Sequence, residues 1–164
     1  MSAGKLTLER PVPDDARRIH ALQREAAPHC IPQPVDEIRS RLDEFQVARD
    51  PERGVLASVA VRPLGELRAE VRGVVVDRRL RGSGLGSALV RWAIRRAVAE
   101  GRQLVCVTRS PAFFESLGFR EIPLSWIPEK PARPPGGPDL PARVAMAWDP
   151  EPARAGQQEQ VRHV

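Results

Sequence analysis

A glycine-rich turn in residues 74–90, VVVDRRLRGSGLGSALV, lies between a β-branched run and a helical pattern. The alternate glycines of segment 82–86 remove side chains where the backbone would approach a ligand closely. The first amides of the next helix have no intrahelical partner and lie at the positive end of its dipole. Such a helix start binds phosphate or pyrophosphate, and Arg78, Arg79 and Arg81 add positive charge there. The turn therefore predicts a site for a phosphate-bearing ligand.

The spacing of this turn excludes the two commoner phosphate-binding loops. No lysine follows the glycines, as the pattern G-x-x-x-x-G-K-[ST] requires. Ser87 stands three positions after Gly84, and Leu89 stands three after Gly86, so G-x-G-x-x-G does not fit either. The turn also lacks the early strand–helix–strand context of a dinucleotide-binding fold.

Two motifs resemble the GNAT acetyltransferase superfamily. The pattern R-G-x-G-x-G after a valine-rich strand is similar to the acetyl-CoA loop of that family. Residues 113–119, FFESLGF, resemble its F-[YF]-E-x-L-G-F segment and follow at a suitable distance. The order of the expected elements also matches that fold from Leu6 to Asp149. The resemblance implies an acetyltransferase that uses acetyl-CoA as cosubstrate and no metal.

The resemblance also implies how acetyl-CoA is held. The backbone of Val74, Val75 and Val76 would pair with the pantetheine arm like an extra strand. The pyrophosphate would be wrapped by one segment, which consists of Arg81, Gly82, Ser83, Gly84, Leu85, Gly86 and Ser87. Phe113 and Phe114 would lie near the pantetheine and the thioester, and packing in the core is the alternative interpretation of these two rings.

Acetyl transfer from a thioester to an amine needs a base for the amine proton and an acid for the leaving thiolate. In this superfamily the acid is often a tyrosine of the FFE segment. This chain contains no Tyr, and Phe114 takes that position. Another group must therefore protonate the thiolate, or the thiolate leaves unassisted.

Further segments resemble one branch of the superfamily, the short bacterial N-acetylglutamate synthases and related amino-acid acetyltransferases. These segments are DEFQVA (43–48), AEVR (69–72), VCVT (105–108) and VAM (144–146). In that branch a glutamate on the AE strand is the proposed base, and it corresponds to Glu70. The hydroxyl residue that ends the following strand is the proposed acid, and it corresponds to Thr108.

Arg72 and Gln33 are the candidate acceptor-binding residues. Arg72 follows Glu70 by two positions, on the same strand face, and can hold a carboxylate in a bidentate fork. A solvated ion pair on the strand is the alternative interpretation of Glu70 and Arg72. Gln33 stands where the synthases carry an arginine that binds the substrate's α-carboxylate. ArsN-type arsenic-resistance acetyltransferases also lack that arginine, so the resemblance leaves the acceptor open.

Three functions are compatible with these motifs. The first is direct transfer of acetyl from acetyl-CoA to the primary amine of a small amino acid or amino-acid-like substrate. The second is acetylation of a protein N-terminus, a lysine or a drug amine. The third is CoA binding by a sensor without catalysis, which the missing tyrosine favours.

The hydrophobic pattern predicts an α/β (α+β) protein, a mixed sheet with helices packed on its faces. The resemblance implies that this is the GNAT fold, with a mostly antiparallel sheet of about six to seven strands flanked by about four helices. Residues 1–150 are expected to form a single domain, and the polar residues 151–164 a disordered tail. Strands are expected near 6–8 and at 45–49, 55–61, 70–76, 104–108, 119–122 and 144–148. Helices are expected at 14–26, 35–45, 84–100 and 112–117, with a long loop at 129–143. The valines at 74–76 are expected to be buried on both faces of the sheet.

Composition restricts the partners and the compartment. The 164-residue chain has a net charge of +5, but its arginines are interleaved with acids and its few aromatic residues offer little stacking surface for nucleic acid. No apolar run approaches the length of a membrane span, and the N-terminus has no apolar signal-peptide core. The sequence therefore predicts no membrane association and a cytoplasmic location. Cys30 and Cys106 are isolated, which excludes a disulfide framework and a structural zinc. The expected partner is a small-molecule amine, and dimers are common enough in the superfamily to allow a homodimer.

Overall fold

The computed structural model describes residues 5–130 and 142–150, and within them the elements follow the predicted order. The first unit, Met1–Leu104, contains β1 (Thr7–Glu9), α1 (Ala16–Glu25), α2 (Val35–Ser40), β2 (Phe45–Asp50), β3 (Gly54–Leu64), β4 (Arg68–Val76) and α3 (Leu85–Ala99). The second unit, Val105–Val164, contains most of β5 (Gln103–Thr108), together with α4 (Pro111–Glu115), β6 (Phe119–Ile122) and β7 (Val144–Trp148).

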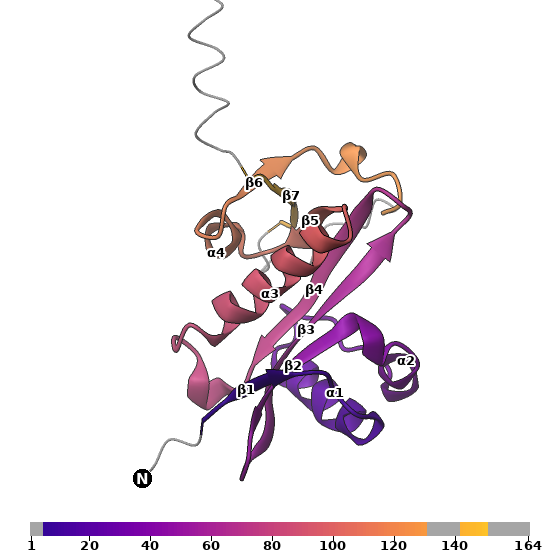
Figure 1. Cartoon of the computed structure of the whole chain (residues 1–164). Coiled ribbons are helices and arrows are strands. Elements are labelled where there is room, and N and C mark those ends of the chain that lie inside the picture. Colours follow the sequence, from indigo (N-terminus) through magenta and orange to yellow (C-terminus); the bar gives the residue numbers. More distant parts are fainter. Residues whose placement is uncertain (1–4, 131–141, 151–164) are drawn as a thin grey trace, which may run out of the picture. The chain divides into compact units, whose positions relative to one another are not determined.

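The four strands of the first unit pair antiparallel in the order β1-β2-β3-β4, as expected for consecutive strands joined by short turns. Helices α1 and α2 pack together on one side of these strands, and α3 lies on the other side (Figure 1). The inward stripe of α1 is fully buried and consists of Ala16, Ile19 and Leu22. It packs in one cluster with Ile38 of α2 and Ala60 of β3, which therefore faces these two helices.

A bulge interrupts β4 close to the glycine turn. Ala60 of β3 pairs with Arg72 and Ser58 pairs with Val75, so β4 contains one more residue than β3 across this interval. Gly73 lies at the bulge with a φ of 60°, a left-handed conformation that glycine adopts without strain. A bulge bends its strand, and only Val75 of the three terminal valines is fully buried. The prediction that all three are buried on both faces was wrong for this reason.

The second predicted helix, 35–45, is shorter than expected. Helix α2 ends at Ser40, because Arg41 leaves the helical region with a φ of −128° and a ψ of 29°. A turn of 3-10 helix, Leu42–Glu44, follows. Phe45 is already paired with Ala60 in the sheet, so the chain has to leave the helix before this residue. The first predicted helix, 14–26, likewise begins as a 3-10 turn before α1 starts.

In the second unit β7 pairs antiparallel with both β5 and β6. Phe114 of α4 is buried and meets Phe113 and Phe119 edge to face, with ring centroids 5.0 and 5.1 Å apart. Gly118 ends the turn after α4 with a φ of 94°, a left-handed conformation typical of a glycine that follows a helix. Most of the predicted loop 129–143 and the whole predicted tail 151–164 lie outside the described residues.

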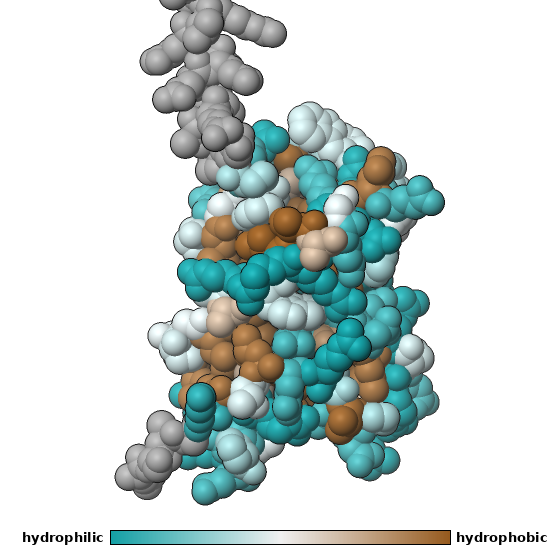
Figure 2. Space-filling model, viewed as in Figure 1, coloured by the Kyte–Doolittle hydropathy of each residue, from teal (hydrophilic) through white to brown (hydrophobic). Residues whose placement is uncertain are grey.

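The predicted fold class is confirmed, because the described residues form four α-helices and seven strands, with antiparallel pairing throughout each unit. The face shown in Figure 2 is largely hydrophilic, with hydrophobic residues in small patches. Exposed apolar side chains include Leu6 and Leu8 near the outer strand β1. No helix in the described part of the chain is both long and apolar enough to cross a membrane.

Candidate active site

The predicted phosphate loop has the geometry that its glycines require. Gly82 and Gly84 have φ values of 81° and 84°, and both are exposed. A Cβ added at either position would meet no atom within 4 Å, so open space lies in front of this backbone. Gly84 is the N-cap of α3, and its carbonyl accepts the first helical bond, from the N–H of Ala88 at 3.1 Å. The N–H groups of residues 84–87 therefore have no intrahelical partner and can bind an anion.

A buried carboxylate anchors the start of this loop. Asp77 follows β4 directly and caps the 3-10 turn Arg78–Leu80 by accepting a hydrogen bond from the N–H of Arg79 at 3.0 Å. It also accepts a bond of 2.8 Å from Nη2 of Arg18 on α1 and two bonds of 3.1 Å from the guanidinium of Arg79. The bonds from Arg79, with a smaller contribution from Arg18, hold the pKa of Asp77 well below its usual range. The loop is therefore tied to α1 by a charged contact.

Glu70 and Arg72 lie on the face of β4 that α1 and α2 cover. Directly opposite residues of an antiparallel pair share a face, and Arg72 is opposite Ala60, which belongs to the core under these helices. Glu70 is opposite Arg62 and only 4% exposed, which excludes the alternative of a solvated ion pair for this carboxylate. Its Oε2 atom is buried and receives no hydrogen bond from the described residues, although the side chain has other interactions. Arg72 is half-buried.

Gln33 is held against α1 by a reciprocal amide contact. Its backbone N–H donates to Oε1 of Gln23 at 2.8 Å, and Nε2 of Gln23 donates to Oε1 of Gln33 at 3.1 Å. The carbonyl of Gln33 contacts Nδ1 of His20 at 2.6 Å. Gln23 is fully buried, and its Nε2 would lie 3.4 Å from a Cβ placed on Gly73 of β4. The fold thus brings Gln33 close to the strand that carries Glu70 and Arg72.

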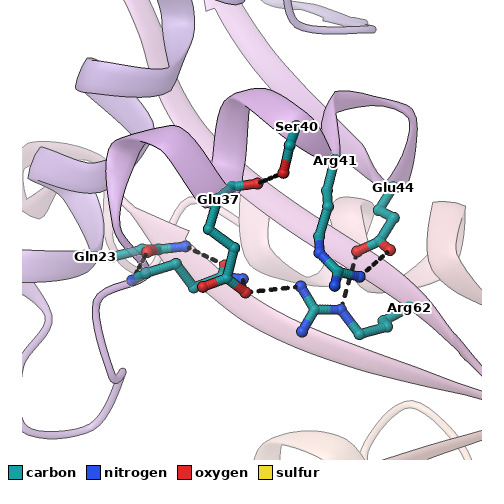
Figure 3. Close-up of polar contacts among 7 residues, drawn as sticks. Gln23, Glu37, Ser40, Arg41, Glu44 and Arg62 are labelled. Atoms are coloured by element: carbon teal, nitrogen blue, oxygen red, sulfur yellow. Dashed lines mark hydrogen bonds and ion pairs between the residues drawn. The ribbon is translucent and has the colours of Figure 1, made fainter.

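A chain of polar contacts continues from Gln33 to β3, and Figure 3 labels its charged members Glu37, Arg41, Glu44 and Arg62. Nε2 of Gln33 donates to Glu37 of α2 at 3.4 Å, and Nη2 of Arg62 donates to the same Oε1 atom at 3.4 Å. Nε of Arg62 donates to Glu44 at 3.1 Å, and Arg41 donates to the other oxygen of Glu44 at 3.3 Å. Through Glu37 of α2, Arg62 therefore joins the loop that carries Gln33 (the acceptor loop) to β3, where Arg62 lies opposite Glu70.

The remaining predicted residues belong to the second unit. Thr108 ends β5, is half-buried, and its Oγ1 accepts a hydrogen bond of 2.9 Å from the N–H of Ser110. The hydroxyl hydrogen stays available for donation. Phe114 takes the place of the expected tyrosine and packs between Phe113 and Phe119, which supports the core-packing interpretation of this ring. Phe113 is half-buried.

A valine-rich strand leads into an open glycine turn at a helix start, which suits a phosphate-bearing ligand, and a buried glutamate lies on the same strand. Residues 41–121 match the family model of the acetyltransferase (GNAT) domain. This part of the chain belongs to the GNAT superfamily, and the protein is an N-acetyltransferase.

Solved structures share this fold. Rv2747 from Mycobacterium tuberculosis, crystallised with CoA, is 21% identical with a TM-score of 0.72, covering 87% of this chain and 98% of that chain. N-acetylglutamate synthase from Neisseria gonorrhoeae, with coenzyme A and N-acetyl-glutamate, is 15% identical with a TM-score of 0.72, covering 90% of this chain and 35% of that chain. A phosphinothricin acetyltransferase from Sinorhizobium meliloti, in complex with AcCoA, is 21% identical with a TM-score of 0.68, and the match covers 87% of this chain and 86% of that chain. At these identities the likeness shows the fold alone.

Sequence reasoning missed several residues of this site, among them Asp77, Gln23 and Arg62. Gln23 offered a usable signal, because it follows Ile19 by four positions and so falls on the buried stripe of α1. A polar side chain on such a stripe needs a partner, and Gln33 supplies it. The contacts of Arg62 and Asp77 join residues far apart in the sequence and left no local pattern. Among the described residues, no group of three or more His, Cys, Asp or Glu side chains could hold a metal ion.

Proposed function

We propose that this N-acetyltransferase moves the acetyl group of acetyl-CoA directly to the primary amine of a small amino acid or amino-acid-like substrate, in the cytoplasm. The observation that carries the proposal is that buried Glu70 and Arg72 lie two residues apart on the same face of β4. The same strand continues to the open glycine turn. A base, a carboxylate-binding group and a phosphate site thus lie along one strand. A homodimer remains compatible with this function.

Acetyl-CoA is the cosubstrate that fits the glycine turn. The open space in front of Gly82 and Gly84 leaves room for a diphosphate against the backbone. The free N–H groups at the start of α3, from Leu85 to Ser87, supply donors at the positive end of the helix dipole. Arg81 is exposed beside them and adds a mobile charge. The backbone of residues 74–76 is the candidate partner of the pantetheine arm, with Phe113 and Phe114 as candidates for its far end.

Bound acetyl-CoA supplies an activated thioester, and the protein has to manage the protons. An ammonium group cannot act as a nucleophile, so Glu70 accepts the amine proton, directly or through a water molecule. Thr108, in place of the tyrosine that the chain lacks, donates a hydrogen bond to the departing thiolate and relays to it a proton that solvent replaces on the hydroxyl, so that no alkoxide is left. A CoA thiol is acidic enough that this assistance contributes less than the base.

The acceptor is bound on the α1 and α2 side of β4. Arg72 provides a planar fork for a carboxylate of the substrate. Gln33 contributes no charge, and its contacts with Gln23 and Glu37 also hold the acceptor loop in place. Neutral Gln33 fits a substrate whose carboxylate is bound mainly by arginines of the sheet.

The proposal is tested by an acetyl-transfer screen that measures the release of CoA thiol. The acceptors are the free amino acids, peptides with free N-termini, polyamines and aminoglycosides, each with acetyl-CoA. We expect turnover with a subset of the free amino acids. Turnover only with peptides, polyamines or aminoglycosides would refute the amino-acid assignment.

The Glu70→Gln variant, an isosteric change that removes the base, separates catalysis from CoA binding. Loss of a general base typically lowers turnover by about 10²- to 10⁴-fold, while acetyl-CoA affinity should be kept. Unchanged turnover in Glu70→Gln would remove Glu70 from the mechanism. A wild type that binds CoA but acetylates no acceptor would favour the alternative of a CoA-binding sensor.

A further inference from the structure

We propose that Arg62 binds the α-carboxylate of the acceptor, a residue role that rests on the proposed amino-acid acetyltransferase function. Arg62 lies on β3 and pairs directly with Glu70 of β4 in the antiparallel register. Side chains at directly opposite positions share a face, and their Cβ atoms lie about 4.5–5.5 Å apart. The guanidinium group of Arg62 thus belongs to the same face as the proposed base.

Among the described residues, the contacts of Arg62 engage one edge of its guanidinium group. Nε and Nη2 share an edge of the planar group, and they donate to Glu44 and Glu37 respectively. Figure 3 shows the other terminal nitrogen, Nη1, without a contact to the residues drawn. No hydrogen bond or ion pair of Nη1 occurs within the described part of the chain. The side chain is 16% exposed, so a small ligand can reach it.

The two glutamates fix the direction of this free edge. Glu44 is nearly buried and Glu37 is partly exposed, and together they hold the guanidinium from the helix side. A bound carboxylate would accept from the Nη1 edge without displacing either glutamate, because an arginine offers five N–H donors. The group is therefore prepositioned, which lowers the entropy cost of binding.

The position of Arg62 selects the α-carboxylate. In an amino acid, the amine and the α-carboxylate are attached to the same carbon, so groups that bind them must be close neighbours. Arg62 is the direct cross-strand neighbour of Glu70, whereas Arg72 is displaced by two residues along β4. Arg62 thus takes the carboxylate next to the reacting amine, and Arg72 is left for a group on the substrate's side chain. This arrangement supplies the charge that Gln33 lacks.

The inference is tested with two substrate pairs, L-glutamate with its α-amide and L-glutamine with its α-amide. For each acceptor, kcat and KM are measured with the wild type, Arg62→Lys and Arg62→Gln. The lysine variant keeps the charge beside Glu37 and Glu44 but lacks a second planar edge, so it should fold. Arg41→Lys is the matched control, because Arg41 also binds Glu44 but comes from the helix side, between α2 and the 3-10 turn.

We expect the wild type to prefer the amino acid over its α-amide. Losing a hydrogen bond to a charged group should raise KM for the amino acid about 10- to 150-fold in both Arg62 variants, with little change for the amide. The preference should stay intact in Arg41→Lys. Comparing two acceptors within one variant cancels any loss of folded protein.

Each other result overturns the assignment in a distinct way. Equal losses for the acid and the amide, seen in kcat, would make Arg62 a structural residue. Equal use of acid and amide by the wild type would reject Arg62 but leave the amino-acid function standing. A wild type that acetylates none of the four acceptors and does acetylate a peptide or a polyamine would refute the proposed function itself.

Discussion

Replacing Asp77 by Asn tests whether the acetyl-CoA loop is held in place by a buried charge. The change keeps the size of the side chain and one oxygen, which can still accept from the N–H of Arg79. It removes the charge and places an amide NH₂ against the guanidinium of Arg18 or Arg79. The perturbation is therefore electrostatic, with no cavity and no lost volume.

The contacts of Asp77 set the size of the expected effect. The Arg79 side chain is 68% exposed, so solvent screens its ion pair and it counts for little. For stability the Arg18 contact counts most, although the bonds from Arg79 lower the pKa of Asp77 more, because Asp77 is almost fully buried and Arg18 is two-thirds buried and less screened by solvent. A hydrogen bond to a charged group contributes about 1.5–3 kcal/mol, and the variant should lose about 1–2 kcal/mol of it. For a chain of this size the expected fall in Tm is about 2–8 °C.

The effect of Asp77→Asn also depends on pH. The pKa of Asp77 is lowered in the folded protein, so its contribution to stability is fully present above the unfolded value of about 3.9. It is lost as pH falls further towards the folded pKa. The difference in Tm between wild type and variant should thus be constant near neutral pH and shrink below about pH 4.

The assay measures thermal unfolding from about pH 3 to pH 7, a range that includes the reference carboxylate pKa of about 3.9. The KM for acetyl-CoA is measured as well, and it should rise in the variant because the loop loses its anchor. Asp36→Asn is the matched control. Its ion pair with Arg39 has the same chemistry, but the Asp36 side chain is 96% exposed, so no change in Tm is expected. If Asp77→Asn melts like the wild type at every pH, the loop is not held by this carboxylate.

Further substitutions test the other parts of the site. Gly84→Asp and Gly84→Asn meet no atom at Cβ, but the left-handed φ of 84° costs either residue about 1–2 kcal/mol of stability. Because the two side chains are of equal size and share this strain, the charge separates them: Gly84→Asp should abolish acetyl-CoA binding by repelling phosphate, whereas neutral Gly84→Asn should lose far less affinity. Equal titrations of the two variants would contradict the anion site. Thr108→Val should lower kcat with KM unchanged, most strongly where thiolate departure limits the rate, and an unaltered kcat would show that the thiolate leaves unassisted. Gln23→Leu leaves the backbone N–H and the Oε1 atom of buried Gln33 without partners, at about 1–3 kcal/mol each, so the melting temperature should fall. The KM should rise for the acceptor but not for acetyl-CoA. Equal rises in both KM values would show that the loop of Gln33 has no specific role in acceptor binding.

The fold and the conformation of the glycine turn could be predicted from sequence because both depend on local patterns. The inward stripe of α1 repeats at helical spacing, and Gly82 and Gly84 are needed where φ is positive. The end of α2 could not be predicted in this way. Leu42 continues the apolar pattern and still packs on the core, while the backbone at Arg41 has already left the helix. Periodicity reports which side chains face inward, and it does not report how the backbone carries them there.

The charged part of the site depends on contacts between distant residues. Arg18 and Asp77 are 59 positions apart, and Arg62 meets Glu37 across 25 positions. A charged residue in the sequence gives no sign of its partner, and an exposed face is the usual interpretation of such residues. Glu70 is the exception, since the resemblance to a family supplied its role and the structure shows its burial.

The bulge at Gly73 separates two parts of β4, one proposed to face the acceptor and the other leading to the glycine turn. Before it, Glu70 and Arg72 keep the regular alternation that points both side chains to the α1 and α2 side of the sheet. After it, the extra residue shifts the alternation, and the strand reaches Asp77, from which the glycine turn begins. A side chain at position 73 would have to adopt a left-handed φ, and its Cβ would contact the buried amide of Gln23 at 3.4 Å. The bulge that leads β4 into the glycine turn therefore also lies against the amide pair that holds the loop of Gln33.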